Sequence, residues 1–262
     1  NDTLVGGKGN DYLDGGNDID VADYSASDAI TVDLSLSSNQ VTAGTYGIDT
    51  LTDIEVVVGS TYQDVFKGNN STNDTFIGGD SNDTFIATKG SDTYYGGNAT
   101  ISNGTVTTHT ASGIDTVDYS SYSGKVLVDL SASTAIATKS TDTITEGFGS
   151  VESTDTLYDI INITGSAYKD TLIGDAQNNK LNGGAGNDKI TGGAGDDYLI
   201  GWTGDDTFYA TSQNDGADVI DGDNGTNSGN DTVDYSALSN SANKIVVSLT
   251  NGSVYSTVTV TA

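Results

Sequence analysis

Cysteine, proline and methionine are absent from this 262-residue chain, and histidine occurs once, at His109. Without cysteine there is no disulfide framework, no thiol nucleophile and no cysteine-ligated zinc site. Basic residues are scarce too, because nine Lys and Arg stand against 37 Asp and Glu, for a net charge of -28. Such a chain repels nucleic acid and anionic membrane surfaces, and its natural counterions are cations.

Long apolar runs are also missing, since no stretch approaches the ~20 residues of a membrane span. The first residues, "NDTLVGG", do not form a signal peptide, and Asn1 and Asp2 already fall inside a repeat. We therefore expect this sequence to be a piece of a longer protein. Glycine is abundant, at 34 residues, while 14 Tyr and regularly placed apolar residues argue against disorder.

A nine-residue repeat is the main pattern of the sequence. An acidic or amide residue recurs at its sixth place, and an apolar residue follows two places later. The sixth places are occupied by Asp2, Asp11, Asp20, Asp64, Asp74, Asp83, Asp92, Asp170, Asn179, Asp188, Asp197 and Asp206. The apolar places are occupied by Leu4, Leu13, Ala22, Phe66, Phe76, Phe85, Tyr94, Leu172, Leu181, Ile190, Leu199 and Phe208. The repeat thus forms three blocks, the second of which has one extra residue between Asp64 and Asp74.

The best copies of the repeat read "GGKGNDYLD" from Gly6, "GGAGNDKIT" from Gly183 and "GGAGDDYLI" from Gly192. They resemble the RTX nonapeptide, Gly-Gly-x-Gly-x-Asp-x-apolar-x, which binds calcium. The resemblance implies an all-β fold, a parallel β-roll or β-solenoid. In physical terms, glycine pairs tolerate positive φ and form tight turns, and the x-apolar-x triplet forms a short strand whose middle side chain points inward.

Two nonapeptides are predicted to make one coil, so that equivalent residues two repeats apart stack at the ~4.8 Å spacing of neighbouring strands. Asp170, Asp188 and Asp206 then form one column, and Asn179 and Asp197 form the opposite one. Stacked carboxylates repel by about 1 kcal/mol per pair even in water, whereas a bound cation turns this repulsion into attraction. Hard oxygen ligands from Asp and from backbone carbonyls favour calcium over zinc.

We therefore predict several calcium ions as cofactors. Asp, Asn and Gly are also good turn formers, which is the alternative explanation for an isolated copy but not for five copies in phase. Besides the sixth-place residues, the candidate ligands are Asp115, Asp218, Asp231, Gly7, Gly9, Gly184, Gly186, Gly193, Gly195 and Gly204. Trp202 replaces the second glycine of its turn, which puts the calcium site there in question. It either closes the surface of the roll or offers a stacking platform for a sugar.

A larger period surrounds the nonapeptides. "DYS" recurs after each block, and its Tyr24, Tyr119 and Tyr235 are expected to plug the ends of the rolls. Strand-like stretches follow, and "DTLTDIEV" from Asp49 returns as "DTLYDIIN" from Asp155. The predicted order is block 1–25, spacer 26–58, block 59–120 with an insertion at 97–112, spacer 121–164, block 165–236 and the start of a spacer at 237–262. The insertion and the loop 131–154 are expected to be surface hairpins, the first places to look for a ligand.

Residues suited to catalysis are few. A Ser-His-Asp triad would need His109, which lies in a polar insertion without a nucleophile turn nearby. Glycoside hydrolysis needs a pair of carboxylates, and the only glutamates available are Glu55, Glu146 and Glu152. We expect the chain not to be an enzyme.

The resemblance implies a structural extension module of a Gram-negative RTX protein of the adhesin or surface-layer type. Such a protein is exported by type I secretion and folds on calcium outside the cell. The expected partners are calcium ions, neighbouring domains of the same chain, and surface glycans or like subunits, with no nucleic acid and no membrane insertion. Two alternatives remain, namely the calcium-binding tail of an RTX protease, lipase or epimerase, and a module that recognises glycan or ice. Mixed, charged residues at the third and fifth turn places argue against ice.

Overall fold

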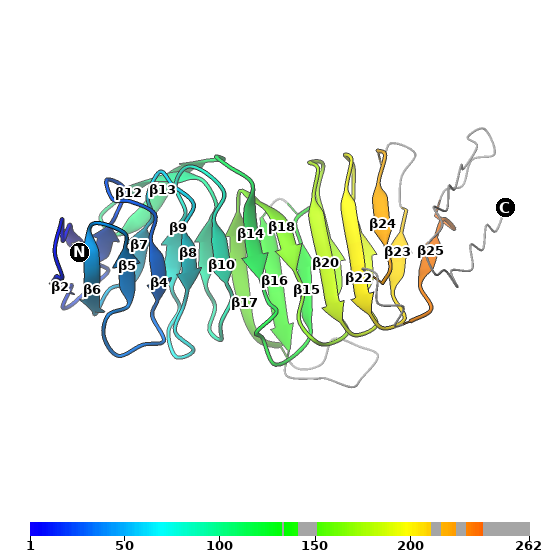
Figure 1. Cartoon of the computed structure of the whole chain (residues 1–262), viewed down its shortest axis with the longest axis horizontal. Helices are drawn as coiled ribbons and strands as arrows, with labels where there is room; N and C mark the ends of the chain where they lie inside the picture. Colours follow the sequence, from blue (N-terminus) through cyan, green and yellow to red (C-terminus); the bar gives the residue numbers. More distant parts are fainter. Residues whose placement is uncertain (133, 141–150, 211–215, 224–228, 238–262) are drawn as a thin grey trace. The chain divides into compact units, whose positions relative to one another are not determined.

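A computed structural model describes residues 1–132, 134–140, 151–210, 216–223 and 229–237. Backbone contacts divide the chain into two compact units, Asn1–Ser121 with Glu152–Ile160, and Tyr122–Val151 with Ile161–Ala262. The described residues form short strands, and within each unit most of these lie side by side in parallel sheets (Figure 1). None of these residues forms a helix long and apolar enough to cross a membrane. The predicted all-β architecture of a parallel β-roll is confirmed.

The first unit has two main sheets and one hairpin. In spatial order, the first sheet contains β1 (Thr3–Leu4), β3 (Val21–Asp23), β7 (Val56–Val58), β9 (Thr75–Ile77), β11 (Thr93–Tyr95) and β17 (Val151–Tyr158). The second sheet contains β2 (Tyr12–Asp14), β6 (Gly47–Thr52), β5 (Val41–Ala43), β4 (Thr31–Asp33), β8 (Val65–Lys67), β10 (Thr84–Ile86) and β14 (Asp115–Asp118). The hairpin consists of β12 (Asn98–Ser102) and β13 (Thr105–Thr110).

The second unit repeats the two-sheet arrangement. One sheet contains β16 (Ala135–Ser140), β15 (Val126–Asp129), β19 (Thr171–Ile173), β21 (Lys189–Thr191), β23 (Thr207–Tyr209) and β25 (Thr232–Asp234). The other contains β18 (Ile160–Thr164), β20 (Lys180–Ala185), β22 (Tyr198–Thr203) and β24 (Val219–Asp221). Strands that follow each other in the chain alternate between the two sheets over β19 to β25, so two nonapeptides make one coil.

The register of the parallel strands confirms the predicted coil of two nonapeptides. Thr171 pairs with Lys189, and Lys189 pairs with Thr207. On the opposite sheet Lys180 pairs with Tyr198. Where a spacer intervenes the offset is longer, and β11 pairs with β17 so that Thr93 lies beside Thr156. The parallel pairing therefore continues from β11 to β17 although the hairpin and strands β14 to β16 lie between them in the chain.

The core of each roll is built from the middle residue of each three-residue strand, as the apolar phase predicts. In the first unit Phe66, Phe76, Phe85 and Tyr94 are fully buried, and their rings contact one another at centroid distances of 5.2 to 6.2 Å. In the second unit Leu172, Leu181, Ile190, Leu199 and Phe208 are buried in the same way. Leu13 and Ala22 are buried too, whereas Leu4 is half-buried.

The spacers contribute antiparallel strands. β5 pairs antiparallel with both β4 and β6, and β16 pairs antiparallel with β15. The loop predicted at 131–154 is described only in part, because residues 133 and 141–150 lie outside the described residues. The third spacer from residue 238 onwards lies outside them as well.

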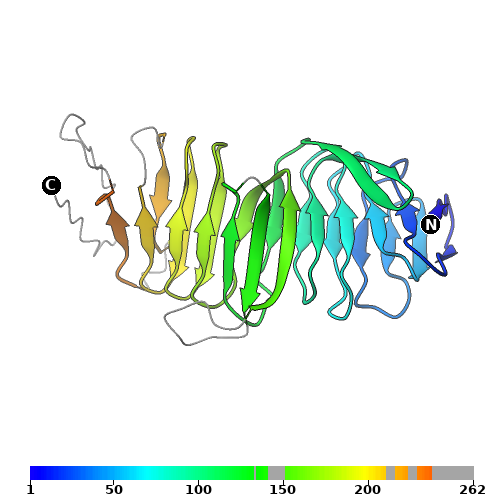
Figure 2. The ribbon, with the colours of Figure 1, turned by 180° about the vertical axis from the view of Figure 1, so that it is seen from behind.

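The insertion in the second block is a surface hairpin, as predicted. Its turn is Asn103–Gly104, with φ of 51° and 72°, the positive values that a two-residue hairpin turn requires. The hairpin lies across the outside of the first unit's strands (Figure 2). Three of its apolar residues, Ala99, Ile101 and Val106, pack on a buried patch of the sheet. This patch consists of Val21, Val56 and Ile77. Outward positions that would face water in a bare roll are apolar here because the hairpin covers them.

An aromatic cluster holds the other end of the hairpin. The imidazole of His109 lies 4.7 Å from the ring of Tyr158 and 5.5 Å from that of Tyr95, and its Nδ1 lies 2.7 Å from Asp159 Oδ2. Tyr95 and Tyr158 stack at 4.6 Å. In the earlier copy of this strand, Thr52 occupies the position of Tyr158. The aromatic cluster is therefore specific to the copy that carries the hairpin.

Candidate calcium sites in the stacked turns

The sixth-place aspartates form a ladder along the second unit. The backbone N–H of Asp170 donates to Asp188 Oδ1 at 2.8 Å, and that of Asp188 donates to Asp206 Oδ1 at 2.7 Å. The N–H of Asp206 in turn donates to Asp231 Oδ1 at 3.0 Å. Oδ1 of each carboxylate therefore accepts a hydrogen bond from the preceding coil. In the regular part of the roll this donor lies two nonapeptides earlier in the chain. The column predicted from the nine-residue spacing is confirmed.

The opposite column has the same construction. The N–H of Asn179 donates to Asp197 Oδ1 at 2.8 Å, and that of Asp197 donates to Asp218 Oδ1 at 3.1 Å. In the first unit the same contact links Asp2 to Asp20, Asp64 to Asp83, Asp83 to Asp115, and Asp74 to Asp92. The structure thus brings nearly all the predicted sixth-place ligands into four columns. Asp2 is the exception, because it contributes only its N–H and its side chain is exposed.

The second oxygen of several ladder carboxylates has no hydrogen-bond partner in the protein. This holds for Oδ2 of Asp11, Asp20, Asp83, Asp115, Asp188 and Asp206, atoms that are themselves buried. A buried carboxylate without a partner costs several kcal/mol, so such groups are normally paired or coordinate metals. These oxygens point to a cation as the missing partner.

The first glycine of the turn is required by the position of this oxygen. A Cβ at Gly183 would lie 2.4 Å from Asp188 Oδ2, and one at Gly201 would lie 2.3 Å from Asp206 Oδ2. Gly78 shows the same relation to Asp83, at 2.2 Å. Only glycine therefore leaves the carboxylate oxygen its place against the backbone.

Backbone carbonyls of neighbouring coils lie close beside these turns. A Cβ at Gly204 would meet the carbonyl oxygen of Gly186 at 1.5 Å, and one at Gly184 would meet that of Ser166 at 2.3 Å. Within the part of the chain that the structure describes, no three His, Cys, Asp or Glu side chains converge as a metal-binding group. A calcium site here combines Asp oxygens with backbone carbonyls, the ligand types that calcium accepts.

Burial and charge both disfavour an uncompensated carboxylate in the ladder. Burial raises the pKa of Asp188 to about 9, with a further contribution from the Asp170 carboxylate. The pKa of Asp83 is raised to about 8, first by burial and then by Asp115 and Asp64, against the N–H of Asp64, which lowers it. Bound calcium would compensate these charges, so the residues present fit the metal.

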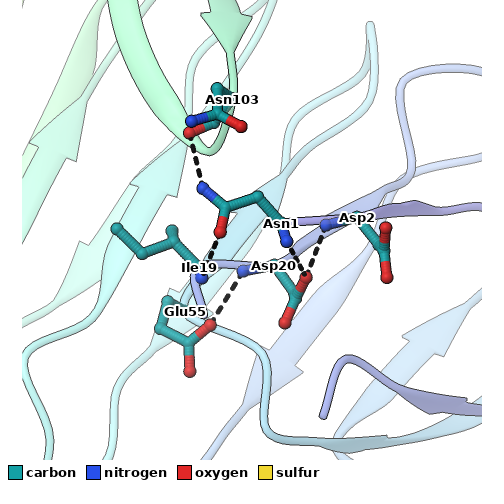
Figure 3. A network of polar contacts seen from close by, with 6 residues as sticks. All are labelled: Asn1, Asp2, Ile19, Asp20, Glu55 and Asn103. Carbon is teal, nitrogen blue, oxygen red and sulfur yellow. Dashed lines mark hydrogen bonds and ion pairs between the residues drawn. The ribbon is translucent and has the colours of Figure 1, made fainter. Parts of the chain in front are cut away.

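Some ladder residues lie outside the nonapeptides counted in the sequence. Glu55 Oε2 accepts the N–H of Asp20 at 2.8 Å and so takes the place of a sixth-place aspartate (Figure 3). Asp49 and Asp155, in the spacers, accept the N–H groups of Asp11 and Asp92 at 2.9 Å each. The signal for the two aspartates was present, since both begin an Asp-Thr-Leu triplet with the Asp-x-apolar phase of the repeat.

The tyrosines of the "DYS" segments close this ladder from inside. Tyr24 and Tyr119 are buried, and their hydroxyls donate to Asp49 Oδ2 at 3.0 Å and to Asp155 Oδ2 at 2.9 Å. These tyrosines are predicted to plug the ends of the rolls. Each also donates a hydrogen bond to an aspartate carboxylate of the ladder. Tyr235 is half-buried.

A second ladder runs outside the first and was missed at the level of sequence. Fifth-place side chains accept the N–H of the fifth-place residue in the next coil. Asn187 Oδ1 accepts the N–H of Asp205 at 3.1 Å, and Asn178 Oδ1 accepts that of Asp196 at 2.9 Å. Asn10, Asn73 and Asn82 make equivalent contacts in the first unit. These side chains reach toward the following coil, whereas the sixth-place carboxylates reach toward the preceding one.

The question raised by Trp202 has a conformational answer. Trp202 has φ of 76°, close to the 96° of Gly184, with which it pairs in register. Its turn therefore keeps the backbone of a glycine turn, and Asp206 Oδ2 is left without a protein partner as in the glycine turns.

The motif, the ladder and the orphaned carboxylates together define a calcium-binding repeat protein with a β-roll fold. The family model of the RTX calcium-binding nonapeptide repeat matches the chain in four copies, at residues 1–22, 69–99, 164–199 and 182–215. The chain carries RTX calcium-binding repeats, and the resemblance stated from the sequence is confirmed. No curated protein matches the chain.

Proposed function

We propose that this chain is a calcium-dependent structural module of an exported bacterial RTX protein, of the adhesin or surface-layer type. The observation that carries the proposal is the set of buried Asp Oδ2 atoms without a protein partner, repeated from coil to coil. With a net charge of -28, the metal-free chain is expanded by self-repulsion, and each calcium ion offsets two charges. The module therefore folds where calcium is plentiful, which is outside the cell.

Circular dichroism during calcium titration tests this function. In chelator we expect a coil spectrum, and at millimolar calcium, the range typical of extracellular modules, a β spectrum. Magnesium at the same concentration is the ionic control, because it demands a tighter octahedral site. A β spectrum that survives exhaustive chelation, or one that magnesium restores equally well, would contradict the proposal.

Absence of enzymatic activity is part of the same proposal. His109 supports it, because its described contacts are Asp159, Tyr95 and Tyr158, which fasten the hairpin. A panel of peptide, ester and glycoside substrates should show no turnover above buffer. Hydrolysis that is lost in His109→Ala would instead assign a catalytic role to the hairpin.

The position of the module in its parent protein distinguishes the remaining candidate functions. A metalloprotease helix motif or a lipase nucleophile turn elsewhere in the same gene product would make this chain the calcium-binding tail of an enzyme. Adhesion is tested directly by immobilising the calcium-loaded chain and measuring capture of glycans or of a second copy of the chain. Binding to neither would leave the structural role of a spacer.

A further inference from the structure

Nine turns of the repeat fall into two groups, which differ in the φ angle of the residue at the second place. The turn of Asp115, which contains the hairpin insertion, belongs to neither group, because its Oδ2 has no protein partner although Gly97 does not have positive φ. In one group the second-place residue has positive φ. The φ values are 86° at Gly7, 81° at Gly16, 103° at Gly79, 96° at Gly184 and 76° at Trp202. In each of these turns the sixth-place Oδ2 has no protein partner, on Asp11, Asp20, Asp83, Asp188 and Asp206 respectively. We call these the open turns.

In a second group the second-place residue is not glycine and its φ is not positive. Its own N–H then points at the sixth-place side chain of the same turn. Ser60 donates to Asp64 Oδ2 at 2.5 Å, Asn69 to Asp74 Oδ2 at 2.7 Å, Ser166 to Asp170 Oδ2 at 2.5 Å, and Asp175 to Asn179 Oδ1 at 2.9 Å. We call these the closed turns, because the protein itself supplies the partner.

Serine closes its turn more completely than the backbone alone. Ser166 Oγ lies 2.9 Å from both oxygens of Asp170, and Ser60 Oγ lies 3.0 Å from Asp64 Oδ1. Each hydroxyl also accepts an N–H, from Tyr168 at 3.1 Å and from Tyr62 at 3.0 Å. Hydrogen bonds to an ionised acceptor are about twice as strong as neutral ones, so these carboxylates are held without a metal.

Closed turns occupy the same place in both blocks. The first coil after the first spacer contains the turns of Asp64 and Asp74, and the first coil after the second spacer contains those of Asp170 and Asn179. Both turns of each of these coils are closed. The turn that follows, at Asp83 or at Asp188, is open. The pattern is therefore tied to the start of a block.

We infer that calcium enters only at the open turns, and that the coil beginning each of these two blocks holds no calcium. This inference rests on the proposed calcium-dependent function. An ion entering a closed turn would have to displace the N–H and hydroxyl donors that already hold the carboxylate. At an open turn it meets an oxygen with no protein partner. The backbone conformation of the second-place residue thus decides which turns take calcium.

The inference divides the ligands predicted from the sequence. Asp64, Asp74, Asp170 and Asn179 leave the set of calcium ligands and become structural. Asp92 joins them, since its Oδ2 accepts the hydroxyls of Thr88 at 3.3 Å and Tyr94 at 3.1 Å. The turn of Asp197, with Gly193 at φ of 109°, belongs by its backbone to the open group.

Calcium stoichiometry of the full chain tests the inference through two matched substitutions. Equilibrium dialysis and calorimetry would count the ions bound by Asp170→Asn and by Asp188→Asn. Both variants keep an Oδ1 acceptor for the ladder. We expect Asp188→Asn to bind fewer ions than the parent chain and Asp170→Asn to bind the same number. Equal losses in the two variants would overturn the inference.

A gain-of-site variant provides the reciprocal measurement. Ser166→Gly removes the hydroxyl and permits positive φ, so the turn should open and the number of bound ions should rise. An unchanged number would show that the second place does not control the site. Asp64→Asn and Asp83→Asn repeat the loss experiment in the other unit, should a variant near Asp170 fail to fold.

The outcomes separate this inference from the proposed function. If the parent chain binds no calcium, the proposed function fails and the inference fails with it. If the parent binds calcium and the closed-turn variants lose ions as readily as the open-turn variants, only the inference fails. Circular dichroism at saturating calcium confirms that each variant has the fold in which its ions are counted.

Discussion

At the scale of the residue, the carboxylate of a sixth-place aspartate has two distinct contacts. Asp188 Oδ1 accepts the N–H of Asp170 from the coil before, and Oδ2 lies against the first glycine of its own turn. The same side chain therefore joins coils and offers its second oxygen to the proposed calcium ion. This double use explains why the residue is buried at 1 % exposure although it is acidic.

Replacing a first-place glycine by alanine should raise the calcium midpoint of folding more than replacing a second-place glycine that has open space around it. In Gly183→Ala the new Cβ would lie 2.4 Å from Asp188 Oδ2, so the carboxylate must move. We expect the calcium midpoint of folding to rise at least about tenfold, the equivalent of about 1.4 kcal/mol. The control is Gly16→Ala, where φ is 81° but no atom lies within 4 Å of the added Cβ. Its cost should be only the backbone strain, about 1 kcal/mol. A smaller effect at Gly183 than at Gly16 would contradict this account.

Protons should partly replace calcium in the ladder. Burial raises the pKa of Asp188 to about 9, of Asp83 to about 8 and of Asp206 to about 6, from an ordinary value of 3.8. A raised folded-state pKa means that the metal-free fold binds protons more tightly than the unfolded chain does. The resulting stabilisation is complete below about pH 4 and is lost as the pH rises from about 6 to about 9.

The measurement is far-UV circular dichroism in chelator across that pH range. We expect β structure to increase as the pH falls, because protonation removes the buried charges that calcium would otherwise compensate. A control in sodium chloride at constant ionic strength separates protonation from screening. β structure that decreases on acidification would show that the ladder does not favour protonated carboxylates.

At the scale of the element, the coil of two nonapeptides is the unit of coupling. Asp188 donates its N–H to Asp206 in the same column, whereas Asp197 belongs to the opposite column with Asn179 and Asp218. Strands β19, β21 and β23 follow one column, and β20, β22 and β24 follow the other. Neighbours along the chain are therefore partners across the roll and not along it.

Double substitutions should reveal this register. We expect Asp188→Ala and Asp206→Ala to be strongly non-additive in calcium midpoint and stoichiometry, because both damage one stretch of ladder. Asp188→Ala and Asp197→Ala should combine more nearly additively. The comparison requires the three single variants and the two doubles. Stronger coupling between 188 and 197 than between 188 and 206 would show that the coil does not act as this unit in solution.

At the scale of the whole molecule, the net negative charge disfavours the compact fold unless cations compensate it. The sequence carries 37 acidic residues against nine basic ones, and the roll stacks many of the acidic ones in columns. Ion pairs among the described residues include Lys67 with Asp33 at 2.9 Å and Lys89 with Glu152 at 3.4 Å, both exposed in part. Such pairs contribute little, about 0 to 1 kcal/mol each, so they do not offset the repulsion.

Small-angle scattering should therefore show collapse on calcium addition. For an expanded chain of this length the radius of gyration is about 55 Å, and calcium should lower it substantially in the same range that restores the β spectrum. Matched ionic strength from sodium chloride is the control, since screening acts on all charges but does not fill the ladder. Compaction by sodium chloride to the same radius would show that general screening, and not site binding, drives folding.

The nine-residue phase was sufficient to determine the fold class, the two-repeat coil, the inward apolar row and the sixth-place columns. These follow from local geometry, because an Asp-x-apolar triplet after a glycine turn defines both the strand and the residue that ends the turn. The hairpin of the insertion was also predictable, since β-branched residues lie on both sides of Asn103 and Gly104. The same phase could have identified Asp49 and Asp155, whose triplets continue the repeat inside the spacers.

Tertiary structure alone decided which oxygens are satisfied and how interrupted coils rejoin. The pairing of β11 with β17 brings Tyr94 beside Leu157 across the end of the second block and most of the second spacer, which no local pattern specifies. The docking of His109 on Tyr158 and Asp159 likewise requires the folded sheet. The most consequential case is the second place of each turn. The sequence places Ser166 and Gly184 at equivalent positions, but only the folded structure shows that φ is positive at Gly184 and not at Ser166, where the N–H reaches the carboxylate.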